Sequence, residues 1–208
     1  MKKKASLIGT IIGVIMFVIV IAGITYAYYT WQSTDINTSG TSEYFKINYV
    51  NGKNITGTDL VPIGEGDFID GNTIKVVEGM ALTTVSIGID SSCNVSGDGT
   101  ITLTPTTISS AFTTGSSVGS IKYKVVQYSS STYPDVTVNN LKDQAFTILN
   151  EGSITSSESI DLYSMSLISG VTNEYLIIFY LDEVLVSNDA GTATFHGTIY
   201  AKAVQSNI

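Results

Sequence analysis

Five residues, Gly115–Gly119, match the Gly-x-Ser-x-Gly pattern of a hydrolase nucleophile elbow, with Ser117 at the nucleophile position. Asp182 or Asp189, followed by His196, would complete a triad in the chain order of such hydrolases. An elbow needs a strand-to-helix turn in a mostly parallel sheet, whereas this pentapeptide lies in a Gly, Ser and Thr stretch within an all-β pattern. We interpret the stretch as a flexible loop and predict no catalytic residue.

Cys93 is the only cysteine and His196 the only histidine. A single histidine excludes a zinc site built from several histidines, and a lone cysteine excludes an intramolecular disulfide. A Cys93–His196 dyad would require two distant segments to meet, and nothing else in the sequence indicates that they do. We expect Cys93 to be a small buried side chain, with an intermolecular disulfide as the alternative, and His196 to lie on the surface.

Three carboxylates, Glu65, Asp67 and Asp70, lie in a glycine-containing loop. Such oxygen ligands suit calcium, but their spacing does not fit the EF-hand loop. We predict a solvated turn, with calcium binding as the alternative. The sequence therefore predicts no cofactor and no assigned metal site.

The first part of the chain carries no charge from Ala5 to Thr34, behind three lysines. The apolar stretch Leu7–Tyr29 is long enough to span a bilayer, which takes roughly 20 residues. It also ends with small residues suited to signal-peptide cleavage between Ala27 and Tyr28. Both outcomes stay open: a membrane-anchored protein with an extracellular domain, or a protein secreted to the cell surface after cleavage. In either case the lysines stay inside and the remainder faces outward.

The rest of the chain is strongly acidic. Beyond the leader, seven lysines stand against eighteen Asp and Glu residues, which gives a net charge near −11 for residues 28–208. A phosphate backbone would be repelled, so nucleic acid is excluded as a partner. The chain divides into an N-terminal segment (1–31), a polar linker (32–43) and an extracellular domain (44–208).

Apolar residues in the domain alternate with period two, as in half-buried strands. The clearest example is 192–203, where Phe195 and Ile199 face one side and Thr198 and Tyr200 the other. Residues 175–181 are apolar on both faces, which is typical of a central strand. The turn residues 187–191 predict that these two strands form a hairpin.

The same alternation predicts further short strands, and helical spacing is hard to find after residue 40. A second hairpin is indicated at Gly97-Asp98-Gly99, between Val85–Ile89 and Ile101–Leu103. Other predicted strands are Tyr44–Val50, Thr73–Val77, Ile121–Tyr128, Ala145–Leu149 and Ser159–Leu162. We therefore expect an all-β fold, an antiparallel jelly-roll-type β-sandwich preceded by one N-terminal hydrophobic helix.

The leader boundary, Gly23-Ile-Thr-Tyr-Ala-Tyr-Tyr-Thr30 behind a lysine start, resembles the signal-peptide ends of the TasA and camelysin group, exported proteins of Gram-positive bacteria. The resemblance covers about the first thirty residues and implies a jelly-roll β-sandwich at the cell surface or in the matrix. It also implies fibres in which each subunit lends a segment near its new N-terminus to a neighbour, and Tyr44–Val50 has the alternation of such a strand. The sequence lacks the His-Glu-x-x-His that a metallopeptidase of this group would need.

Three functions follow, of which we favour the first: a non-enzymatic structural protein of the cell surface or matrix that self-assembles by strand exchange. The second is an adhesin-like module that binds glycans or surface proteins through Tyr123, Tyr128, Tyr133 and Tyr200. The third is an exported hydrolase acting through Ser117 or through an acidic pair.

Overall fold

The computed structural model describes residues 30–32, 47–50, 55–56, 60–190 and 193–205. The predicted leader up to Tyr29, with Ala27 and Tyr28, lies outside this range, as does most of the predicted linker. Within the described residues, no helix has the length and apolar character needed to cross a membrane. These residues form two β-sheets, so the predicted all-β class is confirmed.

The larger sheet has eight strands, in the order β2-β7-β12-β9-β10-β6-β5, with β4 beside β12. All its neighbours run antiparallel except β4 and β12. Its strands are β2 (Ile47–Val50), β4 (Pro62–Ile63), β5 (Ile69–Asp70), β6 (Thr73–Lys75), β7 (Ala81–Ile89), β9 (Ile121–Gln127), β10 (Ala145–Ser153) and β12 (Thr172–Asp182).

The smaller sheet has five antiparallel strands, in the order β1-β13-β8-β11, with β3 also paired to β13. Its strands are β1 (Thr30–Gln32), β3 (Ile55–Thr56), β8 (Ser96–Ile108), β11 (Ile160–Ile168) and β13 (Phe195–Gln205). Four short helical segments complete the described fold: η2 (Glu65–Asp67), α2 (Ser110–Thr113), α3 (Val138–Leu141) and η3 (Asn188–Ala190). Their three or four residues are too few to show a helical period in the sequence.

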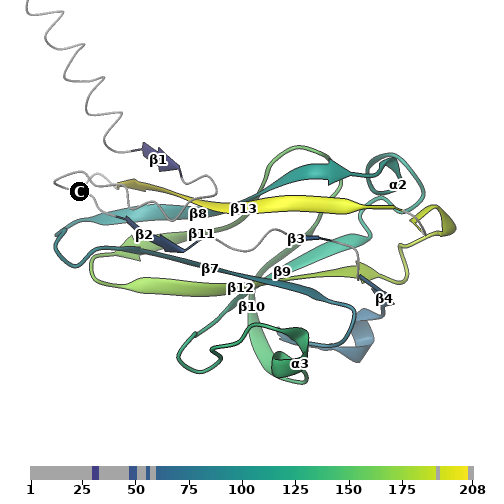
Figure 1. Ribbon diagram of the computed structural model, residues 1–208, viewed down its shortest axis with the longest axis horizontal. Coiled ribbons are helices and arrows are strands. Elements are labelled where there is room, and N and C mark those ends of the chain that lie inside the picture. The colour runs from purple at the N-terminus through teal and green to yellow at the C-terminus, as the bar shows by residue number, and fades with distance from the viewer. Residues whose placement is uncertain (1–29, 33–46, 51–54, 57–59, 191–192, 206–208) are drawn as a thin grey trace, which may run out of the picture.

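The two sheets pack face to face around one shared core (Figure 1). Alternate residues of β13 point into it, among them Phe195, Ile199 and Ala201, while Thr198 and Tyr200 lie on the outer face. This confirms the faces predicted for the last strand. From the larger sheet, Ile177 and Phe179 of β12 enter the same core.

A second core covers the other face of the larger sheet. It contains Ile178 and Tyr180 of β12, which alternate with the residues that face the first core. Apolar residues of 63–80, which include β5 and β6 at the far edge of this same sheet, complete the second core together with the region of α3. Figure 1 shows α3 on the side of this sheet away from β13. Burial on both faces explains why 175–181 is apolar throughout, and its prediction as a central strand is confirmed because β12 lies between β7 and β9.

Both predicted hairpins are wrong. Strands β12 and β13 belong to different sheets, and so do β7 and β8, so neither pair exchanges hydrogen bonds. Residues 97–99, predicted as a turn, lie inside β8. A Cβ at Gly99 would come within 2.8 Å of Met165 Sδ on β11, so that flexible side chain would have to move. Gly99 therefore lies in close side-chain packing within a sheet and not in a chain reversal.

The remaining predicted strands are present with shifted ends. Residues 121–128 and 73–77 correspond to β9 and β6. The strands predicted at 145–149 and 159–162 continue to Ser153 in β10 and Ile168 in β11. The sequence of β11 keeps alternating beyond its predicted end, whereas the polar end of β10 is extended by its pairing with Lys122–Val125 of β9. Of Tyr44–Val50, the described part is β2.

Candidate functional site

Ser117 lies in a buried turn. Its side chain is fully inaccessible to solvent, and its Oγ accepts a hydrogen bond from the Ser187 N–H at 2.9 Å. Helix α2 comes before it and strand β9 after it, the reverse of the strand-to-helix order in a nucleophile elbow. The enclosed hydroxyl is out of reach of a substrate, and the interpretation of this stretch as a flexible loop is also wrong, because Phe112 of α2 and Ser120 are buried as well.

The other proposed triad members lie in different settings, and Asp189, the alternative to Asp182, lies in η3. Asp182, at the end of β12, accepts a hydrogen bond from the Val184 N–H at 2.9 Å and lies 4.0 Å from Lys122 Nζ. His196 pairs with Thr107 of β8 and Thr56 of β3, and its side chain is half-buried on the outer face of the smaller sheet. These contacts hold Asp182 as the cap of a turn and His196 as part of a sheet surface.

Cys93 packs into the core between the sheets with 5% of its surface exposed. The prediction of a small buried side chain is confirmed. A cysteine so enclosed reaches no neighbouring molecule without local opening of the fold.

The predicted acidic loop includes η2, and one of its carboxylates faces inward. Glu65 accepts a hydrogen bond from the Tyr180 hydroxyl, and its Oε1 lies 3.9 Å from Lys124 Nζ. Over the described ranges, no group of three or more His, Cys, Asp or Glu side chains is arranged to hold a metal ion. The residues that could bind calcium are thus engaged in part with a lysine and a tyrosine.

Lys124 is the centre of a charged cluster that sequence reasoning missed. It is 6% exposed on β9, donates a hydrogen bond to Glu151 of β10, and lies 6.0 Å from the ring centroid of Tyr180. Burial, followed by the hydrogen bond to Glu65, raises the pKa of the Tyr180 hydroxyl. The signal in the sequence was a lysine between apolar residues of a central strand, where a charge must find partners. Lys124 itself is enclosed, and its two carboxylate partners link β9 to β10 and to η2.

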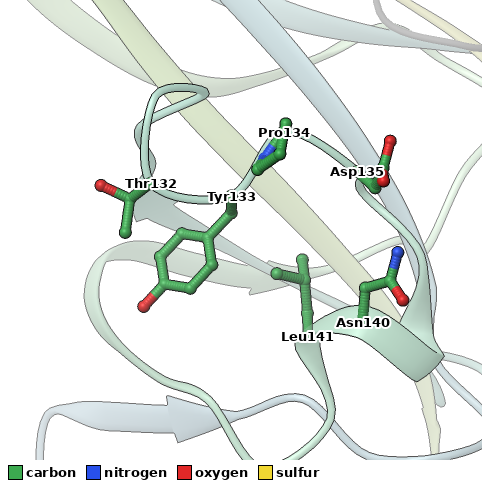
Figure 2. Close-up of a pocket in the computed structure, with 6 residues that line it drawn as sticks. All are labelled: Thr132, Tyr133, Pro134, Asp135, Asn140 and Leu141. Carbon is green, nitrogen blue, oxygen red and sulfur yellow. The ribbon is translucent and has the colours of Figure 1, made fainter.

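A shallow hollow of about 350 Å³ lies beside α3. Figure 2 shows the side chains of Tyr133 and Leu141 on one side of it and those of Asp135 and Asn140 on the other. The Tyr133 backbone carbonyl accepts a hydrogen bond from the Tyr128 hydroxyl, which fixes this loop. The residues that line the hollow include no histidine, cysteine or serine.

The four tyrosines proposed for ligand binding do not share a surface. Tyr123 points into the core between the sheets and Tyr128 into the second core, at 5% and 7% exposure. Tyr133 lines the hollow, whereas Tyr200 is half-buried on the outer face of the smaller sheet. An aromatic platform for a glycan therefore does not form from these residues.

The edges of the two sheets are suited to binding another polypeptide. Three short strands, β1, β2 and β3, which we call the N-terminal arm, lie along these edges. Strand β2 pairs with Ser86–Ile89 of β7. On β13, β1 pairs with Lys202–Val204 and β3 with His196–Gly197.

Comparison with known proteins adds no relative from which a function could be transferred: no family model matches the sequence, and no curated protein matches it.

Proposed function

We propose that the chain is a non-enzymatic structural protein of the cell surface or matrix, whose copies assemble by exchanging N-terminal strands. The observation that carries this proposal is the position of the three short strands of the N-terminal arm at the edges of the two sheets. Four described residues of β2 pair with the nine-residue strand β7. Strands β1 and β3 add three and two residue pairs to β13.

An exposed strand edge is a template for further pairing, because its N–H and C=O groups need partners. A neighbour's arm can pair with the same edge through the same backbone groups, so exchange between copies costs little. The predicted linker of twelve residues could extend to roughly 40 Å, enough to reach an adjacent molecule. The arm is therefore suited to act either within one copy or between two.

The leader supports an extracellular place for this assembly. Cleavage between Ala27 and Tyr28 would release a chain that begins two residues before β1, whereas retention would tether the domain to the membrane through the same segment. The resemblance to the TasA and camelysin group supports export and fibre formation. It also agrees with a finer architecture that we propose, a jelly-roll-type sandwich, because five of the six connections from β7 to β13 cross between the sheets.

The test uses the chain from Tyr28 to Ile208, which contains every described element. We expect its mass in light scattering to rise with concentration. The variant Asn48→Pro with Tyr49→Pro lacks the backbone N–H groups of two adjacent β2 residues. One of these two N–H groups points toward β7, so the variant should lose strand pairing and stay monomeric. The control, Asn48→Thr with Tyr49→Val, keeps those groups and should assemble. A monomeric wild type, or assembly of the proline variant at wild-type concentrations, would refute strand exchange.

A further inference from the structure

The hollow beside α3 lies between two segments, the loop 129–136 and α3 itself, and hydrogen bonds fix both. In the loop, Ser130 donates two hydrogen bonds to the Glu174 carboxylate on β12, from its N–H at 2.7 Å and from its hydroxyl at 2.6 Å. The Tyr133 N–H donates to the Ser129 carbonyl at 3.0 Å. The loop is therefore held against the larger sheet, and it needs little rearrangement to receive a ligand.

The short helix α3 is fixed as well. Thr137 caps it, because its Oγ1 accepts a hydrogen bond from the Asn140 N–H at 3.2 Å. The Leu141 N–H donates to the Thr137 carbonyl at 3.0 Å, and the Leu141 side chain is buried in the second core. The Tyr133 ring packs against the same core, with its centroid 5.5 Å from that of Phe146. A ligand in the hollow therefore meets a firm aromatic wall that is backed by Leu141.

The rim of the hollow is polar and exposed. It includes Thr132, Asp135 and Asn140. Figure 2 shows Asp135 and Asn140 on the side of the hollow away from Tyr133. Backbone groups hold the turn between them, since the Thr137 N–H donates to the Asp135 carbonyl at 3.2 Å. Over the residues that the structure describes, the Asp135 carboxylate and the Asn140 side-chain amide take part in no hydrogen bond, so both are available to a ligand.

This combination of an aromatic wall and a polar rim suits a sugar. A pyranose ring packs its C–H groups on an aromatic face and directs its hydroxyl groups outward from its edge. The rim serves both roles of a hydroxyl, because the Asp135 carboxylate accepts hydrogen bonds while the Asn140 amide donates and accepts them. A lysine or arginine side chain carries donors only, so it leaves the Asn140 amino group without an acceptor. The volume of about 350 Å³ lies within the usual range for small ligands.

The charges around the hollow favour a neutral sugar over an acidic one. Asp135 is the only charged residue in its lining. The next lysine along the chain, Lys142, is paired with Glu78 at 2.7 Å. Two more carboxylates, Glu174 on β12 and Asp143 after α3, add negative charge to the surroundings. An acidic sugar would be repelled by these groups and by the net charge of the whole domain.

We propose that the hollow binds one neutral pyranose unit of a glycan, with the C–H face of the sugar on Tyr133 and its hydroxyls on Asp135 and Asn140. This inference goes beyond the proposed assembly and does not depend on it, because no residue of the N-terminal arm lines the hollow. One shallow site of this kind gives weak binding, with a Kd on the order of 1 mM. In an assembly every copy brings one such site, so a long glycan is held by several at once.

The experiment uses saturation-transfer difference NMR, which detects a bound sugar whether or not the protein assembles. The chain 28–208 is mixed with four neutral trisaccharides: maltotriose, cellotriose, mannotriose and triacetylchitotriose. We expect at least one of them to receive saturation from the protein, with a Kd on the order of 1 mM. The β2 proline variant should bind this sugar as the wild type does.

Variants of the rim locate the binding. Asp135→Ala and Asn140→Ala should each weaken it about tenfold, because each removes a group that hydrogen-bonds to the sugar. Both side chains are exposed, so both variants should unfold in urea at the wild-type midpoint. The matched control is Asn139→Ala, which changes the preceding exposed residue of α3 outside the lining and should bind like the wild type.

Three results would overturn the proposal. The first is no saturation of any of the four sugars at about 20 mM. The second is equal binding by the Asn139→Ala and Asn140→Ala variants, since the sugar would then bind elsewhere. The third is binding of trilysine in place of every sugar, with loss of that binding in Asp135→Asn, which would make the hollow a site for a basic peptide. None of these results bears on strand exchange, so the two proposals fail separately.

Discussion

The two sheets of this protein differ in how many of their faces are buried. Strand β12 of the larger sheet faces the smaller sheet on one side, and on the other it faces a second core shared with β5, β6 and the α3 region, so β12 is apolar at nearly every position. The smaller sheet buries one face, and β13 alternates between buried and accessible residues. A two-sided sheet provides most of the core, while a one-sided sheet leaves a broad polar face.

Polar groups are accommodated differently in the two sheets. In the larger sheet the buried Lys124 is matched by Glu151 and Glu65, since an unpaired charge there would be costly. On the outer face of the smaller sheet, hydroxyls pair across strands, as in the 2.8 Å hydrogen bond from Thr102 Oγ1 to Asp161 Oδ1. The comparison predicts that substitutions of similar size have larger effects in the larger sheet.

The largest expected effect is at the second core. Ile178→Ala should lower the free energy of unfolding by about 2–5 kcal/mol, because it removes a fully buried side chain and leaves a cavity. The matched change Thr198→Ala, on the outer face of β13, should alter it by about 0.5 kcal/mol or less. Urea denaturation measures both. Equal losses in the free energy of unfolding would show that the second core stabilises the fold no more than the outer face of the smaller sheet does.

The next effect concerns the charged cluster. Glu151→Ala leaves Lys124 buried with Glu65 as its remaining partner, and should cost about 1–3 kcal/mol of unfolding free energy. Lys124→Met should cost less, because an apolar chain of similar length replaces the ion pair. Adding Glu151→Ala to Lys124→Met should cost little more. Breaking the exposed Lys142–Glu78 pair by Lys142→Met is the control and should have a much smaller effect.

These comparisons also show why the sequence predicts some features and not others. The faces of β13 and the central position of β12 follow from local alternation, which depends on burial alone. Which strands pair with each other does not follow from local alternation, because β7, β8, β12 and β13 carry similar apolar patterns while belonging to two sheets. The turn after β12 therefore looks like a hairpin turn in the sequence but leads across to the other sheet.

The candidate site was harder to predict for the same reason. Ser117 is buried by a contact with Ser187, seventy residues away, and Lys124 is neutralised by Glu65 and Glu151 from two other segments. Neither contact produces a pattern in the neighbouring sequence from which it could be predicted. The strand predicted at Tyr44–Val50 could be found, since alternation is local, but its position on an edge of β7 could not.

Alkaline pH tests the larger sheet through its buried tyrosines. Burial raises the pKa of Tyr175 to about 12 from an ordinary value near 10, and it raises the pKa of Tyr123 and Tyr180 as well. The folded state therefore retains the phenol proton longer than the unfolded chain does. This stability is fully present below pH 10 and is lost as the pH rises toward 12.

For Tyr175 alone the loss at pH 11 should be about 1.4 kcal/mol. Tyr175→Phe should remove that part, so the variant should lose less stability between pH 8 and pH 11 than the wild type does. Urea unfolding at the two pH values measures the difference. An identical loss in both proteins would mean that Tyr175 does not contribute to the alkaline sensitivity.

The smallest effect is expected on the outer face of the smaller sheet. Thr102→Val keeps the shape of a 6% exposed side chain but removes its hydrogen bond to Asp161, and should cost about 1 kcal/mol of unfolding free energy. Thr100→Val is the neighbouring control on β8, where the hydroxyl lies 3.4 Å from Ser164 Oγ in an exposed position, and should cost less. A larger loss at Thr100 than at Thr102 would contradict the view that this face is stabilised where its hydroxyls are covered. Thr100 and Thr102 pair with β11 and β13 and not with the described strands of the N-terminal arm, so both variants should assemble at wild-type concentrations. This result would separate the stability of the smaller sheet from the strand exchange proposed for assembly.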